Sequence, residues 1–239
     1  MTDIDTWKKE LRAVAREDKI KILSTFFKTG KGEYGEGDVF IGITVPENRS
    51  ISRRYHSIPL NQIETMLMEP VHEFRLAGLL ALVEAYKRAK NDPARCREIA
   101  EFYLANARCC NNWDLVDLSS QYILGEYMIL TGNDNTAWQL AQSDNMWERR
   151  IAIVSMLAFV RKSLLDTPMA LAGALLHSEE SLLQKATGWV LREVGKRDKP
   201  RLCLFLDTHA ATMPRTTLRY AIERFPADER KRYMSLYKK

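Results

Sequence analysis

Apolar residues recur three and four positions apart along nearly the whole chain, the spacing that places them on one face of an α-helix. The first such segment shows it at Ile4, Trp7 and Leu11. Short breaks rich in turn-forming residues separate the segments. The only stretch with a strand-like pattern, Val39 to Val45, contains a glycine and runs into a proline, and both argue against a strand. We therefore expect an all-α fold.

The same pattern predicts where the helices lie. Gly30 to Pro46 holds five glycines and is predicted to be a loop. The predicted helices cover residues 3–16, 19–28, 49–55, 59–68, 71–90, 94–108, 113–130, 135–142, 147–163, 168–176, 180–196, 199–207, 214–224 and 227–237.

Three helix starts resemble one another, at residues 70–75, 145–150 and 180–185. In each, a turn residue is followed by an apolar anchor and then a basic residue, and the segments recur with a period of about 35 residues. This pattern indicates a HEAT-like repeat solenoid of antiparallel helix pairs, which curves and has a concave face. We expect one such domain over residues 1–239; an irregular helical bundle is the alternative.

Composition limits the function only loosely. The formal net charge is +5 and the pI about 9.0, which suits an acidic partner such as nucleic acid. No apolar run is long enough to cross a membrane, and residues 1–21 lack the apolar core of a secretion signal, so we expect a cytoplasmic protein. The four cysteines, Cys96, Cys109, Cys110 and Cys203, have no metal-binding spacing, so we expect reduced thiols and no metal.

The segment from Asn112 to Asp117 contains the most distinctive candidate site. If Asn112 caps a helix, Trp113 and Asp117 stand four positions apart on one face and can meet one ligand. Asp114 is expected to point elsewhere and to favour the helix N-terminus by its charge. The alternative is that Trp113 belongs to the core and Asp117 is a solvated surface charge.

Two later segments combine tryptophan with arginine. Trp147 and Arg150 are three positions apart, and so are Trp189 and Arg192. In each pair the arginine could face a phosphate, or the pair could simply belong to a packed or solvated helix face. Gly188 costs a helix about 1 kcal/mol relative to alanine, which indicates that another backbone approaches closely there.

Three other motifs are set aside. Residues 30–35 match GxGxxG, but no strand precedes them, so a dinucleotide site is not expected. His72 and Glu73 lack the second histidine of a zinc protease, and we expect His72 to be a capping or surface residue. Ser119 and Ser120 lack the glycines of a hydrolase nucleophile turn.

Taken together, the segments resemble the AlkD-like alkylpurine DNA glycosylases, and they do so in order along most of the chain. The segments that carry the resemblance are Gly42–Arg49, His72–Leu76, Asn112–Asp117, Trp147–Ile153 and Gln184–Glu193.

The resemblance implies a solenoid whose concave basic face holds duplex DNA. It implies that Trp113, Asp117 and Trp189 surround the damaged nucleotide, that Arg150 grips the backbone, and that Arg192 adds a contact. Two further residues, Phe26 and Arg49, are expected to bind substrate or DNA. Where the family often has a tyrosine near the lesion, this chain has Phe26 or Phe27, and the loop from Gly30 to Asp38 is an insertion.

The implied reaction is hydrolysis of the glycosidic bond of positively charged N3- or N7-alkylated purines in duplex DNA, as in base excision repair. Asp117 would be the catalytic carboxylate, no cofactor or metal would take part, and the protein would act as a monomer. Two other functions remain open: a non-catalytic HEAT-like scaffold for structured DNA or protein partners, and a nucleic-acid binder without preference for lesions.

Overall fold

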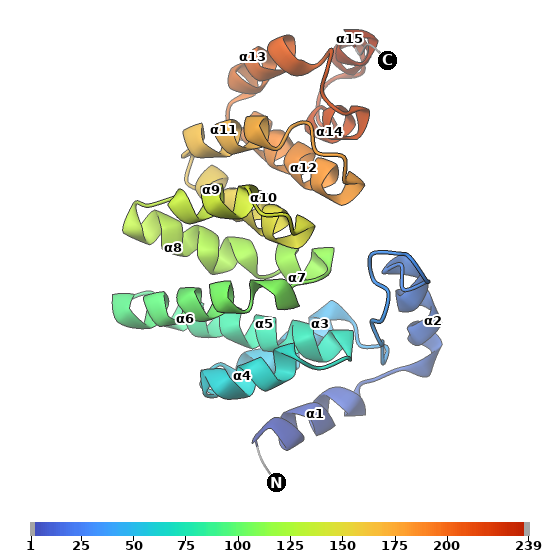
Figure 1. Ribbon diagram of the computed structural model, residues 1–239, viewed down its shortest axis with the longest axis vertical. Helices are drawn as coiled ribbons and strands as arrows, with labels where there is room; N and C mark the ends of the chain where they lie inside the picture. The colour runs from blue at the N-terminus through green and yellow to red at the C-terminus, as the bar shows by residue number, and fades with distance from the viewer. Residues whose placement is uncertain (1–2, 237–239) are drawn as a thin grey trace. The chain divides into compact units, whose positions relative to one another are not determined.

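The computed structural model describes residues 3–236 and is built from α-helices and short 3₁₀ turns (Figure 1). No strand forms among these residues; Val39 and Val71 make an isolated bridge. The predicted all-α fold is confirmed and is consistent with a HEAT-like architecture. Contacts within the chain divide it into two compact units, up to Ile123 and from Leu124 on. A single continuous domain stays a prediction.

The first unit is organised around α5, His72–Arg88, which is buried along nearly all of its length. Helices α3, α4, α6 and α7 all pack against α5. The helical elements of this unit are α1 (Asp3–Ala13), α2 (Glu17–Phe26), α3 (Val45–Ser52), η1 (Arg53–Tyr55), α4 (Leu60–Leu67), α5 (His72–Arg88), α6 (Pro93–Ala105), η2 (Ala107–Cys109), α7 (Trp113–Asp117) and η3 (Ser120–Tyr122).

Helix α3 begins earlier than the sequence pattern predicts, inside the expected loop. The Glu47 carboxylate accepts hydrogen bonds from the Thr44 backbone N–H, at 3.1 Å, and from the Thr44 hydroxyl. Pro46 lies in the first turn, where a helix does not need the missing N–H donor. Thr44 and Glu47 therefore fix the helix start four residues before Arg49.

The helix predicted over residues 113–130 is wrong, because it breaks after Asp117. The buried Ser119 hydroxyl donates to the Leu115 carbonyl at 2.5 Å, which is the acceptor that the Ser119 N–H would use in a continuous helix. The Ser119 N–H bonds the Val116 carbonyl instead, and the hydroxyl also lies 3.0 Å from the Tyr103 hydroxyl. The break leaves α7 as a separate short helix.

In the second unit, long helices pack in succession. Helix α10 lies against α8, α9, α11 and α12, and α12 in turn packs against α13 and α14. The helices of this unit are α8 (Leu124–Thr131), α9 (Asn135–Ala141), α10 (Met146–Arg161), α11 (Asp166–Ala174), α12 (Ser181–Arg197), α13 (Lys199–His209), α14 (Arg215–Ala221) and α15 (Ala227–Leu236).

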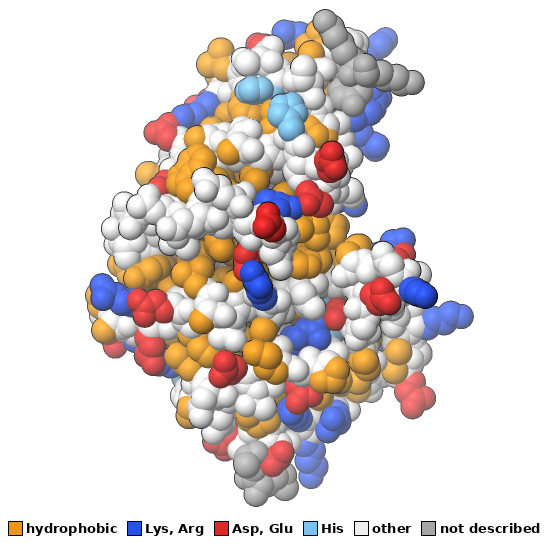
Figure 2. Space-filling view, viewed as in Figure 1, with side chains coloured by type: hydrophobic (Ala, Val, Ile, Leu, Met, Phe, Trp, Pro, Cys, Tyr) orange, Lys and Arg blue, Asp and Glu red, His pale blue; other side chains and the backbone are white. Residues whose placement is uncertain are grey.

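Surface charge is mixed in sign on the face shown in Figure 2, where basic, acidic and hydrophobic side chains are interspersed. A concave basic face therefore stays a prediction from the resemblance. Within residues 3–236, none of the helices combines the length and the apolar character needed to cross a bilayer.

The close approach predicted at Gly188 is confirmed. A Cβ atom added there would lie 2.5 Å from the Tyr220 Cβ and 2.6 Å from the Thr217 carbonyl oxygen, so α12 and α14 touch at this glycine. Neither neighbour is the end of a flexible side chain. Gly188 is therefore what allows these two helices to pack at this distance.

We expect Gly188→Ala to lower the free energy of unfolding by about 1–3 kcal/mol, because the added methyl group forces α12 and α14 apart. Gly173→Ala is the matched control: the nearest atom to its added Cβ, on Phe205, lies 3.8 Å away. This control should leave stability unchanged or raise it by up to about 1 kcal/mol. Urea unfolding of both variants measures the difference, and equal stabilities would contradict the packing argument.

Candidate functional site

A cavity of about 410 Å³ lies in the first unit, between the end of α2, the loop before α3, and helices α5 and α7. Trp113 and Asp117, four positions apart on α7, both line it, as their spacing predicts. Asn112 caps the helix as expected, since its side-chain oxygen accepts the Trp113 N–H at 2.8 Å. Both lining residues are half-buried, so Trp113 is not a core residue and Asp117 is not a fully solvated charge.

Aromatic rings form one side of this cavity. Trp113 stacks on Phe27, with the ring centroids 5.0 Å apart and the ring planes inclined at 11° to each other. Phe26 meets the Trp113 ring edge-on at 5.6 Å. Phe27 is buried, whereas Phe26 is 61% exposed. The two phenylalanines therefore have different roles: Phe27 supports the Trp113 ring, and Phe26 forms an exposed edge of the cavity.

A buried histidine also lines the cavity, where its ring packs against Phe27 and Phe40. His72 is 1% exposed, and its Nδ1 and Nε2 lie 2.9 Å from Asp38 and 2.8 Å from Asp114. Arg75 donates to the second oxygen of Asp38 at 2.5 Å. The expectation of a capping or surface histidine is wrong, because two carboxylates from distant segments enclose the ring. Asp114 binds His72 through one of its oxygens, and the other accepts the Leu115 N–H at 2.9 Å in the first turn of α7, so Asp114 supports the helix start as expected.

Electrostatics keep this cluster charged. Burial by itself would lower the pKa of His72, but the charges and hydrogen bonds of Asp114 and Asp38 outweigh it and raise the pKa to about 9. Burial would raise the pKa of Asp38, yet the hydrogen bond from His72 and the charge of Arg75 hold it below its usual value. At neutral pH a protonated His72 therefore donates to both carboxylates.

Glu73 fixes the loop that forms another wall of the cavity. Its Oε1 accepts the backbone N–H groups of Ile41, Gly42 and Ile43 at 3.1, 2.8 and 3.2 Å. Gly42 has φ +86°, and a Cβ there would lie 1.9 Å from the Arg16 carbonyl oxygen, so only glycine fits. The cavity wall is thus attached directly to the first turn of α5.

The other predicted site residues lie elsewhere. Arg49 is exposed on α3 and lines a different cavity. Trp189 and Arg192 are half-buried on α12 in the second unit, where Arg192 pairs with Glu223 and Glu193. Arg150 is buried on α10, and its Nη1 donates to the Leu182 carbonyl. Roles in a common site for these residues stay predictions.

Sequence reasoning missed the residues that hold the site in place: Asp38, Phe40, His72, Glu73 and Asp114. Phe40 stacks on the His72 ring at 4.6 Å and also lines the cavity. One signal was available. His72, Glu73 and Arg75 are ionisable residues directly before the apolar stretch Leu76 to Val83, and such residues need partners when they are buried.

Comparison with known proteins identifies a family and a similar solved structure. The model of a family described as DNA alkylation repair enzyme matches residues 7–225. A solved structure of a predicted DNA alkylation repair enzyme from Enterococcus faecalis is similar, at 19% sequence identity and a TM-score of 0.66. The likeness covers 89% of this chain and 97% of that one, and at this identity it shows the fold alone. No curated protein matches the chain.

We expect stability to fall at alkaline pH through His72. The pKa of this group rises from an ordinary 6.5 to about 9 on folding, so its stabilisation is complete below about pH 6.5 and is lost as the pH rises through about 9. Between these values the free energy of unfolding should fall by up to about 1.4 kcal/mol per pH unit. Urea unfolding from pH 6 to 10 measures this slope.

His72→Gln should remove this slope, and the same change at the exposed His177 should preserve it. An alkaline slope that persists unchanged in His72→Gln would show that the buried cluster is not its source.

Proposed function

The chain belongs to the DNA alkylation repair enzyme family, and on that premise we propose that it is a DNA glycosylase that removes N3- and N7-alkylated purines from duplex DNA. The family gives the role in DNA alkylation repair. The kind of reaction, the lesions and the residues that carry it are the proposal.

The observation that carries the proposal is the position of a carboxylate beside two aromatic rings, the half-buried Trp113 and the exposed Phe26. Asp117 and Trp113 line one cavity of about 410 Å³, and Phe26 lines it too. A volume of this size lies within the usual range for small-ligand sites. An aromatic surface next to a negative charge is suited to a flat, cationic group.

Alkylation at N3 or N7 gives a purine a formal positive charge. A ring of this kind is attracted to the faces of Trp113 and Phe26 by cation–π interaction, worth about 0.5–2 kcal/mol per ring. The charge also weakens the glycosidic bond, because the base departs as a neutral molecule. The protein need not protonate the leaving group, which fits a site with a carboxylate and no general acid assigned to it.

In the proposed reaction the bond between C1′ and the purine nitrogen breaks, and its electron pair leaves with the base. Positive charge then develops on the deoxyribose, where the Asp117 carboxylate stabilises it and orients a water molecule. The water oxygen bonds to C1′ and passes a proton to the Asp117 carboxylate, which then releases it to the solvent. No cofactor enters this balance.

The remaining assignments come from the resemblance. Trp189 would add an aromatic surface at the lesion, while Arg150 and Arg192 would hold the phosphate backbone without reading its sequence. A monomeric, cytoplasmic protein and a duplex substrate belong to the same proposal.

We expect Asp117→Asn to slow base release about 10²- to 10³-fold, because the amide cannot stabilise the positive charge on the sugar. DNA affinity should stay within about threefold of the wild type, since binding depends mainly on phosphate contacts. The measurement is single-turnover release of 7-methylguanine and 3-methyladenine from methylated duplex, alongside fluorescence anisotropy of the same duplex.

The matched control is Glu98→Gln, which neutralises an exposed carboxylate on α6 and should release bases at the wild-type rate. Rapid excision by Asp117→Asn would reject the catalytic role. A folded wild type that binds DNA but releases no base would favour a non-catalytic scaffold.

We expect Arg150→Ala to weaken DNA binding and to reduce the slope of log affinity against log salt by about one, the change expected for one lost phosphate contact. Arg149→Ala is the control, because Arg149 is engaged by Glu180 and the Ser143 carbonyl. Thermal unfolding must first show both variants folded, since Arg150 is buried. An unchanged salt slope in folded Arg150→Ala would argue against the contact.

A further inference from the structure

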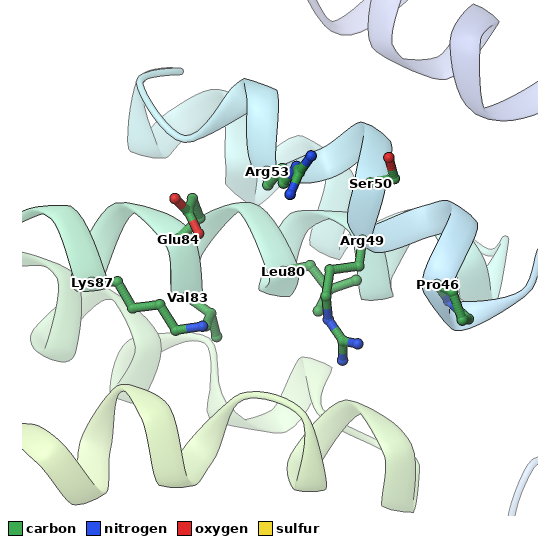
Figure 3. A pocket seen from close by; sticks show the side chains of 8 residues that line it. All are labelled: Pro46, Arg49, Ser50, Arg53, Leu80, Val83, Glu84 and Lys87. Carbon is green, nitrogen blue, oxygen red and sulfur yellow. The ribbon is translucent and has the colours of Figure 1, made fainter.

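A second cavity of the first unit, about 400 Å³ in volume, lies between α3 with η1 on one side and α5 on the other (Figure 3). Each side contributes residues at positions i, i+3, i+4 and i+7, so one face of each helix lines the groove. The residues are Pro46, Arg49, Ser50 and Arg53 on the first side, and Leu80, Val83, Glu84 and Lys87 on the second.

The groove has an apolar floor and cationic sides. Leu80 and Val83 are buried, whereas Arg49, Arg53 and Lys87 are exposed. Figure 3 shows Arg49 reaching from α3 past Leu80, and Lys87 lying along α5 toward Val83. The Lys87 ammonium is 5.3 Å from the centre of the Tyr122 ring.

The arginines of the groove differ from their neighbours in having no carboxylate partner among residues 3–236. The one acidic residue of the groove, Glu84, is engaged by Arg88 at 2.9 Å. Five other arginines of the first unit are held in ion pairs, which are Arg16–Glu47, Arg54–Glu10, Arg75–Asp38, Arg88–Glu84 and Arg95–Glu98. Arg49 and Arg53 are thus left to bind an anion from outside.

Helix α3 connects this groove to the aromatic cavity. Pro46 lines both cavities, and the turns that follow it supply Arg49 and Arg53. The two arginines are about 6 Å apart along the axis at the α-helical rise of 1.5 Å per residue. A nucleotide in the aromatic cavity would therefore extend its strand along α3, past both guanidinium groups.

We propose that this groove binds successive backbone phosphates of duplex DNA beside the damaged nucleotide, which rests on the function proposed above. Arg49 and Arg53 contact the phosphates through their guanidinium groups, whose planar donors suit phosphate oxygens. Lys87 adds a point charge, and the Ser50 hydroxyl is a further donor. The contacts position the DNA and read no sequence.

The test uses Arg53→Gln combined with Lys87→Gln in the full chain, with unmodified duplex as the probe. Fluorescence anisotropy at several salt concentrations should show binding weakened about tenfold or more, with the salt slope reduced by about two. Arg54→Gln is the matched control: it removes the same charge at the next position, where the guanidinium pairs with Glu10 at 2.7 Å. It should bind nearly as the wild type does.

A second probe locates the contact. Two neutral methylphosphonate linkages placed next to the lesion should weaken wild-type binding but should affect the double variant much less, because the groove has already lost two of its three cations and keeps only Arg49. The proposal would be overturned if the methylphosphonate linkages weakened binding equally in both proteins. It would also be overturned if the folded double variant bound unmodified duplex with the affinity and the salt slope of the wild type. So would a double variant that binds DNA normally but loses binding to a polyglutamate peptide, since the groove would then fit an acidic protein.

Failure of the groove and failure of the glycosylase are separable. Binding of unmodified duplex does not depend on base release, so the groove can be confirmed in a protein that excises nothing. Conversely, a wild type that excises methylated bases, together with a double variant of unchanged affinity, would leave the glycosylase intact and reject the groove alone.

Discussion

The ion cluster around His72 determines where the parts of the candidate site lie. Asp38 comes from the loop after α2, His72 from the start of α5, and Asp114 from α7, so one imidazole joins three segments that are 34 and 42 residues apart. Buried charges of this kind add little stability relative to a well-packed apolar cluster of the same size, because desolvation offsets much of their attraction. Removing one partner would nevertheless leave an unpaired charge in the core. The cluster therefore acts mainly by permitting only one arrangement of the loop, α5 and α7.

The next residue along the chain extends this arrangement to the backbone. Glu73 accepts the N–H groups of three successive loop residues, and the loop leads directly into α3 through Thr44. The aromatic cavity and the cationic groove lie on either side of Pro46, so both depend on how this loop is held. Two neighbouring buried side chains, His72 and Glu73, therefore determine where both the aromatic cavity and the cationic groove lie.

Local sequence patterns predicted those features that depend on neighbours in the chain. Helical periodicity located most helices within a few residues, and the spacing of Trp113 and Asp117 placed both on one cavity. Gly188 revealed a close helix contact because its cost inside a helix needs a reason. The break after Asp117 was missed because it depends on a buried serine hydroxyl taking a backbone carbonyl. His72 was misjudged because its partners become visible only in the folded chain.

Helix α7 is only five residues long, well below the dozen or more that an isolated helix needs to persist in water. Its shape is therefore a property of the surrounding unit rather than of its own sequence. Trp113 and Asp117 gain and lose their positions together, whenever the contacts of Asn112 and Asp114 form or break. Partial unfolding of this unit should accordingly produce two populations of molecules, one with Trp113 and Asp117 both in place and one with neither. Molecules of the first population should bind and react with the same substrate preference as the intact protein.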